Sequence, residues 1–183
     1  MNIQYTIQFF SEWHCGSGLA AGADVDELVI KDKNNLPFVP GKTLKGLVRE
    51  AVEEILAFQQ KQAPASFVDM FGNSKDKGCS FFKNAELPVD LRDSIITQGL
   101  SSYLYRSIAS TAIDDKDIAK KNSLRKMQTV VPCSLEGEIL NVPNDFVPEI
   151  VNGLKFIKCL GQNRNRGLGR CQITVNTKEG GNK

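Results

Sequence analysis

The chain has 183 residues and a mass of 20.2 kDa, which is enough for one well-cored domain and short for two. Its composition, 41% hydrophobic and 24% charged with 15 Gly and 7 Pro, excludes a disordered chain, a coiled coil and a collagen-like fibre. The formal net charge of +2 is too small to indicate nucleic-acid binding by itself, so the distribution of the charges has to decide that question.

The sequence predicts a cytoplasmic protein with reduced cysteines. No apolar run reaches the roughly 18 residues that a membrane-spanning helix needs, and the first residues lack the basic and apolar regions of a signal peptide. The cysteines number five and none forms a Cys-x-x-Cys pair, which argues against a disulfide framework and against a zinc site of that type. We therefore expect buried thiols and no membrane partner.

Strand and helix patterns alternate along the chain. Residues 3–9 alternate apolar and polar side chains as in a half-buried strand, and residues 43–60 have the apolar spacing of an amphipathic helix with Thr43 as its N-cap. Further strands are predicted within 28–30, 78–87, 102–108, 127–140 and 171–175, and a second helix within 145–160. This order predicts an α+β fold with a ferredoxin-like (RRM-like) core, helices on one face of the sheet, and long inserted loops.

A charged arm interrupts this pattern. Residues 110–126 are polar, carry charges of both signs and hold too few large apolar side chains for a core segment. They predict a projecting hairpin, which we place at about residues 107–127 of a single domain spanning 1–183. The tail 176–183 is expected to be disordered.

The segment VPGKTLKGLVR (39–49) is a candidate phosphate site. The first N–H groups of a helix have no partner within it, and Lys45 and Arg49 lie one turn apart on one face. A P-loop is disfavoured because Leu36 stands where that motif needs a glycine. Gly46, inside the predicted helix, indicates that another backbone or a ligand comes close. On this segment alone, an ordinary solvated helix face is an equal alternative.

The segment GQNRNRGLGR (161–170) is a second candidate, with three Gly and three Arg in ten positions. Glycine lets a backbone approach a polyanion, and arginine makes charge-assisted contacts with phosphate and stacks on bases. A plain turn is the less favoured alternative.

Acidic residues follow a Gly-rich loop at positions 24, 26 and 27, where solvation or capping is the commoner role. EF-hand spacing is absent there and near Asp114, which argues against a dedicated calcium site. His14 is the only histidine, so two imidazoles cannot act as acid and base within one chain. We expect His14 to serve packing and its neighbours Trp13 and Phe10 to lie in the core.

In combination, the Gly-rich loop, LPFVPGKTLKGLVR, MFGNS and LGQNRNRGLGR resemble the RAMP superfamily of CRISPR-associated proteins, and more narrowly the backbone subunit of type III effector complexes. The resemblance spans about residues 3–175, and each motif alone is weak. It implies an RRM-like core, a filament of subunits along a CRISPR guide RNA, and a thumb hairpin that kinks the duplex of guide and complementary target RNA. The charged arm fits the thumb.

The resemblance also implies site residues. Cleavage of target RNA falls on Asp26, because the cutting aspartate of the family precedes a short apolar stretch that ends in a basic residue and Asp, supplied here by VDELVIKD. Asp24 is the alternative, and Asp32 is expected to organise the turn. Mg²⁺ or another divalent cation would assist cleavage without being a tightly bound structural metal. Guide contacts fall on Gly41, Thr43, Lys45, Arg49, Gly161, Arg164, Arg166, Gly167, Gly169 and Arg170.

Three functions within the family remain open. The chain could be a backbone subunit that binds guide RNA and cleaves target RNA, a catalytically silent guide scaffold, or a guide-processing RAMP endonuclease, which the single histidine disfavours. The implied partners are guide RNA, target RNA, other subunits of the complex and further copies of the chain. Outside the family, a generic RNA-binding domain is the remaining alternative.

Overall fold

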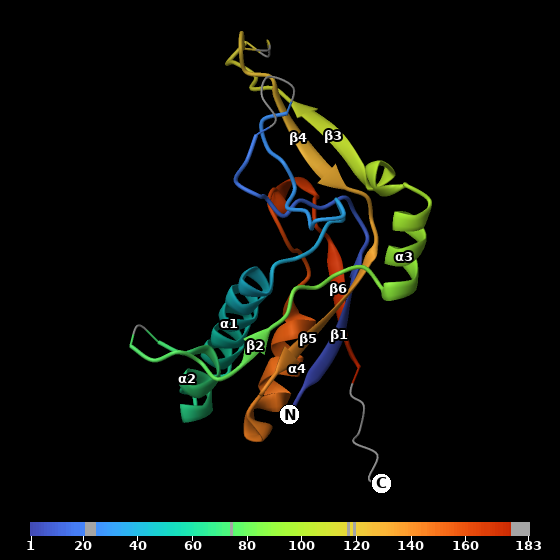
Figure 1. Ribbon diagram of the computed structural model, residues 1–183. Coiled ribbons are helices and arrows are strands. Elements are labelled where there is room, and N and C mark those ends of the chain that lie inside the picture. The colour runs from blue at the N-terminus through green and yellow to red at the C-terminus, as the bar shows by residue number, and fades with distance from the viewer. Residues whose placement is uncertain (21–24, 74, 117, 119, 177–183) are drawn as a thin grey trace.

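The computed structural model describes residues 1–20, 25–73, 75–116, 118 and 120–176. Its centre is an antiparallel sheet in which β1 (Ile3–Phe9) lies between β5 (Ser134–Leu140) and β6 (Cys171–Asn176), with the short β2 (Phe81–Phe82) on the outer edge of β5. Helices α1 (Gly41–Phe58) and α4 (Val147–Phe156) cover one face (Figure 1). Within this sheet and its two covering helices, the order along the chain is β1-α1-β2-β5-α4-β6, which confirms the predicted ferredoxin-like α+β class.

The alternation along β1 decides which side of the sheet is the core. Every second side chain of the strand is buried against the helices, beginning with Ile3, while the residues between them, beginning with Gln4, face the other way. Gly137 of β5 lies opposite Tyr5 and leaves room for its ring. Gly153 of α4 similarly makes room for Val52, so that the two helices pack closely.

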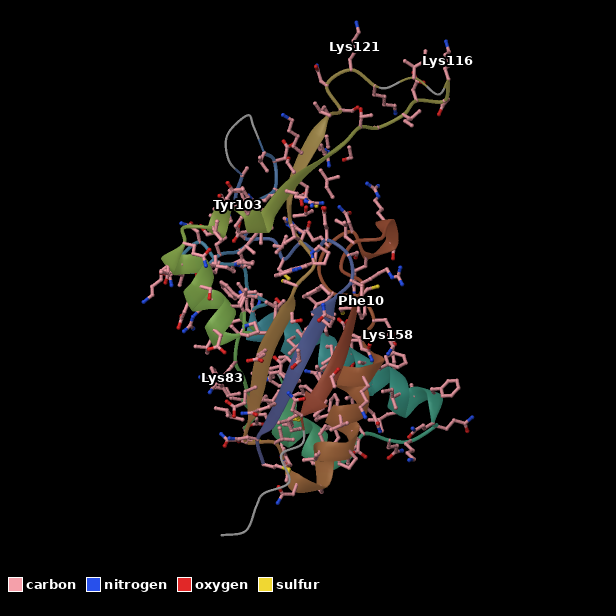
Figure 2. All side chains as sticks on the ribbon, turned by 90° about the vertical axis from the view of Figure 1, so that its right-hand side faces the viewer. Phe10, Lys83, Tyr103, Lys116, Lys121 and Lys158 are labelled. Carbon is pink, nitrogen blue, oxygen red and sulfur yellow. The ribbon has the colours of Figure 1, made fainter. Side chains whose placement is uncertain are left out.

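A second, two-stranded sheet forms the projecting hairpin. Strands β3 (Tyr105–Ser110) and β4 (Arg125–Val130) pair antiparallel and extend away from the main sheet (Figure 1), which confirms the predicted hairpin. We call residues 105–130 the thumb. Lys116 and Lys121 lie at its far end (Figure 2). The single strand predicted over 127–140 is wrong, because residues 131–133 divide it between the two sheets.

Several other local predictions are wrong. Helix α1 begins at Gly41 with Pro40 at the N-cap, so Thr43 lies in its first turn and caps nothing. Helices α2 (Ala65–Phe71) and α3 (Val89–Thr97) were not predicted, and residues 101–104 form a 3-10 turn, η1 (Ser101–Leu104), rather than strand. The strand predicted within 78–87 shrinks to β2, and 28–30 holds an isolated bridge at Val29. Asn176 closes β6, and the rest of the predicted tail lies outside the described residues.

The thiols differ in their surroundings. Burial raises the pKa of Cys15 and of Cys171 to about 12, as expected for core cysteines. Cys79 is exposed, contrary to the expectation.

Within the described ranges, no helix is both long enough and apolar enough to cross a membrane.

Two glycines of α1 give a matched test of how this helix packs against its neighbours. A Cβ at Gly41 would collide with the carbonyl oxygen of Phe82 in β2, whereas a Cβ at Gly46 would meet no atom within 4 Å. We expect Gly41→Ala to lower the free energy of unfolding by roughly 1–3 kcal/mol through overpacking. Gly46→Ala should raise it by about 0.5–1 kcal/mol through helix propensity. Urea unfolding followed by circular dichroism measures both, and equal midpoints would contradict the prediction.

Candidate nucleic-acid interface

The segment 161–170, named here the Gly-Arg loop, lies between α4 and β6. It folds around a short 3-10 turn, η3 (Arg164–Arg166), flanked by Asn163 (φ 54°) and Gly167 (φ 88°) in left-handed conformations. Gly167 has open space around it. The space at this glycine leaves room for the backbone of a ligand, and a contact of Gly167 with RNA stays a prediction.

The other two glycines of the loop have a different role. A Cβ at Gly161 would collide with the carbonyl group of His14, and one at Gly169 with the carbonyl group of Leu160. The neighbour that requires these glycines is therefore the backbone of this chain.

The arginines of the Gly-Arg loop are available for a ligand. Arg164, Arg166 and Arg170 are exposed, and none of them is in an ion pair with any residue that the structure describes. A hollow of about 580 Å³ is lined by Gly161, Gln162, Asn163, Arg164, Asn165 and Arg166. Guanidinium groups around such a hollow suit a phosphate.

The start of α1 offers less than the sequence suggests. Gly41 is buried, and its N–H donates to Oδ1 of Asn84 (3.0 Å). Arg49 pairs with Glu53 (3.0 Å) and lies over the ring of Phe67, 5.4 Å from its centroid. Gly41 and Arg49 are thus less available to RNA than predicted, whereas Thr43 is exposed and Lys45 half-buried.

Asp26 lies in an extended segment that runs beside β4. Its N–H donates to the carbonyl oxygen of Lys126 (2.9 Å), and its Oδ2 accepts a hydrogen bond from the N–H of Lys126 (2.7 Å). A bridge between Glu27 and Met127 continues the contact. The Asp26 side chain is exposed, and its Oδ1 has no hydrogen bond to any residue that the structure describes. Asp24, the alternative, lies outside the described residues.

The far end of this segment is held by the other thumb strand. Nζ of Lys31 lies 4.0 Å from the centroid of the Tyr105 ring in β3, and partial burial lowers the pKa of Lys31. The hydroxyl of Tyr105 donates to the carbonyl oxygen of Asn35 (2.7 Å). Oδ1 of Asp32 accepts hydrogen bonds from the N–H groups two and four residues ahead (2.8 Å each), so it organises the turn as predicted.

Glu12, which sequence reasoning missed, joins the thumb to the Gly-Arg loop. Oε2 accepts a hydrogen bond from the hydroxyl of Thr129 in β4 (2.7 Å), and Oε1 pairs with Nη1 of Arg106 in β3 (3.1 Å). Its carbonyl oxygen accepts the N–H of Gly169 (2.7 Å). The side-chain partners lie 94 and 117 positions away, so no local pattern marks this residue.

His14 packs between the same elements. Its Nδ1 lies 2.6 Å from the carbonyl oxygen of Gln128. Because a carbonyl oxygen only accepts, Nδ1 carries a proton and donates. Nε2 faces Oε2 of Glu27 at 4.0 Å, and the carbonyl oxygen of His14 accepts the N–H of Gln162 (2.9 Å). With 1% of its surface exposed, His14 serves packing, as predicted, and does not reach a substrate.

The Gly-Arg loop, the Asp26 segment and the base of the thumb meet at the end of the main sheet from which the thumb projects (Figure 1). Nδ2 of Asn163 in the Gly-Arg loop donates to Sδ of Met127 (3.4 Å), the residue that pairs with Glu27. The loop and the Asp26 segment are therefore neighbours through β4, and α1 begins at the same end. The arrangement can hold a chain of phosphates on the arginines and present a carboxylate beside it.

Comparison with known proteins identifies the family of this chain. A family model described as the RAMP superfamily matches residues 6–172. The chain belongs to the RAMP superfamily. Among curated RAMP relatives, the CRISPR system Cms endoribonuclease Csm3 of Streptococcus thermophilus is 29% identical over 171 residues, which cover 82% of this chain and 76% of that protein. The resemblance stated from the sequence is thereby confirmed.

Solved structures agree on the RAMP fold. A chain of type III-B Cmr-beta bound to cognate target RNA superposes with a TM-score of 0.76 at 11% identity, covering 96% of this chain and 97% of the other. The apo state of type III-B Cmr-beta gives a TM-score of 0.73 at 12% identity, with 97% and 98% covered. At such low identity, the likeness concerns the fold alone.

In this RAMP chain, we expect Glu12 to fix the thumb on the core. Glu12→Ala removes the ion pair of Arg106 and the nearer acceptor of the buried Thr129 hydroxyl, leaving it the carbonyl oxygen of Arg106 at 3.4 Å, so the free energy of unfolding should fall by about 1–3 kcal/mol. Amide hydrogen exchange in β3 and β4 should become faster. Glu50→Ala, at an exposed position of α1, is the control and should change stability by less than about 0.5 kcal/mol. Unchanged exchange in the thumb would contradict this role of Glu12.

Proposed function

We propose that this chain is a backbone subunit of a type III CRISPR effector complex that binds guide RNA and cleaves complementary target RNA. The observation that carries the proposal is an exposed carboxylate, Asp26, fixed on the thumb beside a loop whose exposed arginines pair with no described acidic residue. Membership of the RAMP superfamily and the 29% identity to an endoribonuclease support it. Its partners would be guide RNA, target RNA, other subunits and further copies of this chain.

Guide binding would depend on the Gly-Arg loop more than on α1. The loop combines a hollow and open space at Gly167 with Arg164, Arg166 and Arg170, none of which pairs with a described acidic residue. Contacts with phosphate provide affinity without reading sequence. That property suits a subunit that must accept any guide.

Cleavage would use the 2′-hydroxyl of the target as nucleophile. Its oxygen attacks the adjacent phosphorus, forming a 2′,3′-cyclic phosphate, and the bond to the 5′-oxygen breaks. The 5′-oxygen takes up a proton and leaves as a 5′-hydroxyl. Oδ1 of Asp26, which has no hydrogen bond to any described residue, would accept the proton of the 2′-hydroxyl, while Oδ2 stays on the thumb backbone. If Oδ1 instead helps to hold a divalent cation, solvent water would take up that proton.

A divalent cation fits this site if the RNA shares in binding it. Mg²⁺ characteristically uses one or two carboxylates together with phosphates and water. Within the described part of the chain, no cluster of three or more His, Cys, Asp or Glu side chains could hold a metal unaided. When bound, the ion would stabilise the negative charge that develops on the phosphate.

Asp26→Asn separates the chemistry of this carboxylate from its structural contact. Asparagine keeps an oxygen for the N–H of Lys126 and loses the charge. We expect cleavage to fall by about 100-fold or more, with guide and target binding within about twofold, because phosphate contacts elsewhere carry the affinity. Cleavage of a labelled complementary RNA by the assembled complex measures the rate. Wild-type cleavage should stop in EDTA and leave a 5′-hydroxyl.

Asp145→Asn is the matched control, since Asp145 is exposed in η2 (Asn144–Phe146). It should cut at the wild-type rate. If Asp26→Asn also cuts at that rate, Asp26 is not the cleaving residue. If the wild-type complex binds target RNA but never cuts it, the silent-scaffold alternative holds.

The loop arginines should set the salt dependence of guide binding. Arg164→Gln and Arg166→Gln should each remove one contact with phosphate and so reduce the salt slope by roughly one. Arg49→Gln, whose guanidinium is paired with Glu53, should leave the slope unchanged. Binding of a labelled guide RNA over a series of salt concentrations gives the slopes. If only Arg49→Gln changes the salt slope, the guide contacts α1 and not the Gly-Arg loop.

A further inference from the structure

Phe10 is exposed where the sequence predicts a core residue. The structure leaves 58% of Phe10 accessible, while Trp13 close by is fully buried. The backbone of Phe10 is fixed, because its N–H donates to the carbonyl oxygen of Arg170 (2.8 Å). The register of β1 and β6 ends with Phe9 opposite Cys171, and the backbone hydrogen bond sets Phe10 beside Arg170 just beyond that pair. An exposed aromatic residue and an exposed arginine are thus cross-strand neighbours.

Phe10 lies at the upper end of the open face of the sheet, the face turned away from α1 and α4, just below the Gly-Arg loop (Figure 2). Further down, β1 and β6 present polar side chains on this face, with Gln4, Thr6 and Gln8 on β1 and Gln172 and Thr174 on β6. Protein-docking patches are built from contiguous apolar side chains. The described neighbours of Phe10 on this face do not form one.

We propose that Phe10, with Arg170 beside it, is a stacking platform for one unpaired base of bound RNA. The proposal rests on the proposed function and adds a contact to it. Four-stranded sheets of the RRM type stack bases on aromatic side chains of their open face, and stacking tolerates any base. Arg170 can bind the phosphate next to the stacked base, and the Gly-Arg loop continues directly from it.

The charges on the open face limit the platform to this end. Glu136 of β5 is exposed, and its backbone forms an antiparallel bridge with that of Glu86. Glu138 is neutralised by Lys83 (2.7 Å). Uncompensated carboxylates repel phosphate, so RNA would cross the upper end of the sheet and not its length. The platform therefore takes one base rather than a row of them.

Phe10→Leu tests the platform with the full chain and a short, unstructured, fluorescein-labelled RNA as the probe. Anisotropy should show binding weakened by about fivefold to a hundredfold, the range for loss of one aromatic–base stack, whereas Phe10→Tyr should stay within about twofold. The salt slope of Phe10→Leu should not change, because stacking releases no counterions. Arg170→Gln should instead lower the slope by roughly one.

Phe58→Leu is the matched control, since Phe58 is 91% exposed at the far end of α1. It should bind RNA as the wild type does. In a Phe10→Trp variant, bound RNA should quench the fluorescence of the new tryptophan, while the fluorescence of the buried Trp13 should stay constant.

The outcomes separate this proposal from the function on which it rests. A wild-type chain that binds no RNA would overturn both. If the wild type binds RNA and Phe10→Leu binds it equally well, the platform alone fails. If Phe10→Leu binds RNA normally but no longer self-associates in sedimentation, Phe10 contacts protein and the stacking proposal is wrong.

Discussion

The structure at the end of the sheet that carries the thumb depends on the path that the chain takes directly after β1. The rings of Phe9 and Trp13 stack with centroids 4.6 Å apart and planes 11° from parallel, and both are buried. Trp13 then exchanges two backbone hydrogen bonds with Val130 of β4 (3.1 and 2.8 Å). Its neighbours Glu12 and His14 accept hydrogen bonds from the Gly-Arg loop on the other side. One extended segment thus has the thumb along one edge and the loop along the other, and neither can shift without breaking these bonds.

Elements with a long, uniform pattern were predictable from the sequence, and those decided by distant contacts were not. The alternation in β1 and the apolar stripe of α1 each persist long enough to define a period. Helices α2 and α3 span 7 and 9 residues, too few for a clear helical period. Strands β4 and β5 look like one strand because the break at 131–133 is imposed by pairing with different partners. No local pattern shows how the helix start is satisfied, because Asn84, the acceptor for the N–H of Gly41, is 43 positions away.

The candidate site likewise has parts that the sequence predicts and parts that only distant contacts define. The local composition of the Gly-Arg loop and the resemblance at Asp26 marked segments that the structure brings together through β4. The sequence could not show that Gly161 and Gly169 serve the packing of this chain, or that Arg49 is already paired. Glu12 left no trace in the sequence, because an isolated acid gains its role only from Arg106 and Thr129. Phe10 was misplaced because apolar character indicates burial on average, while exposure depends on which face of the sheet it occupies.

The pairing of β1 with β6 has a consequence for folding during synthesis. Thr6 and Asn176 meet across these two strands although they are 170 positions apart. The central strand therefore lacks one partner until residues 171–176 have left the ribosome, whereas the thumb pairs residues close in sequence. Contacts of high sequence separation form slowly, and unpaired strand edges are prone to aggregate. A nascent chain should thus display a formed hairpin attached to an incomplete sheet, a state in which chaperones or early contact with a partner would protect the open edge of β1.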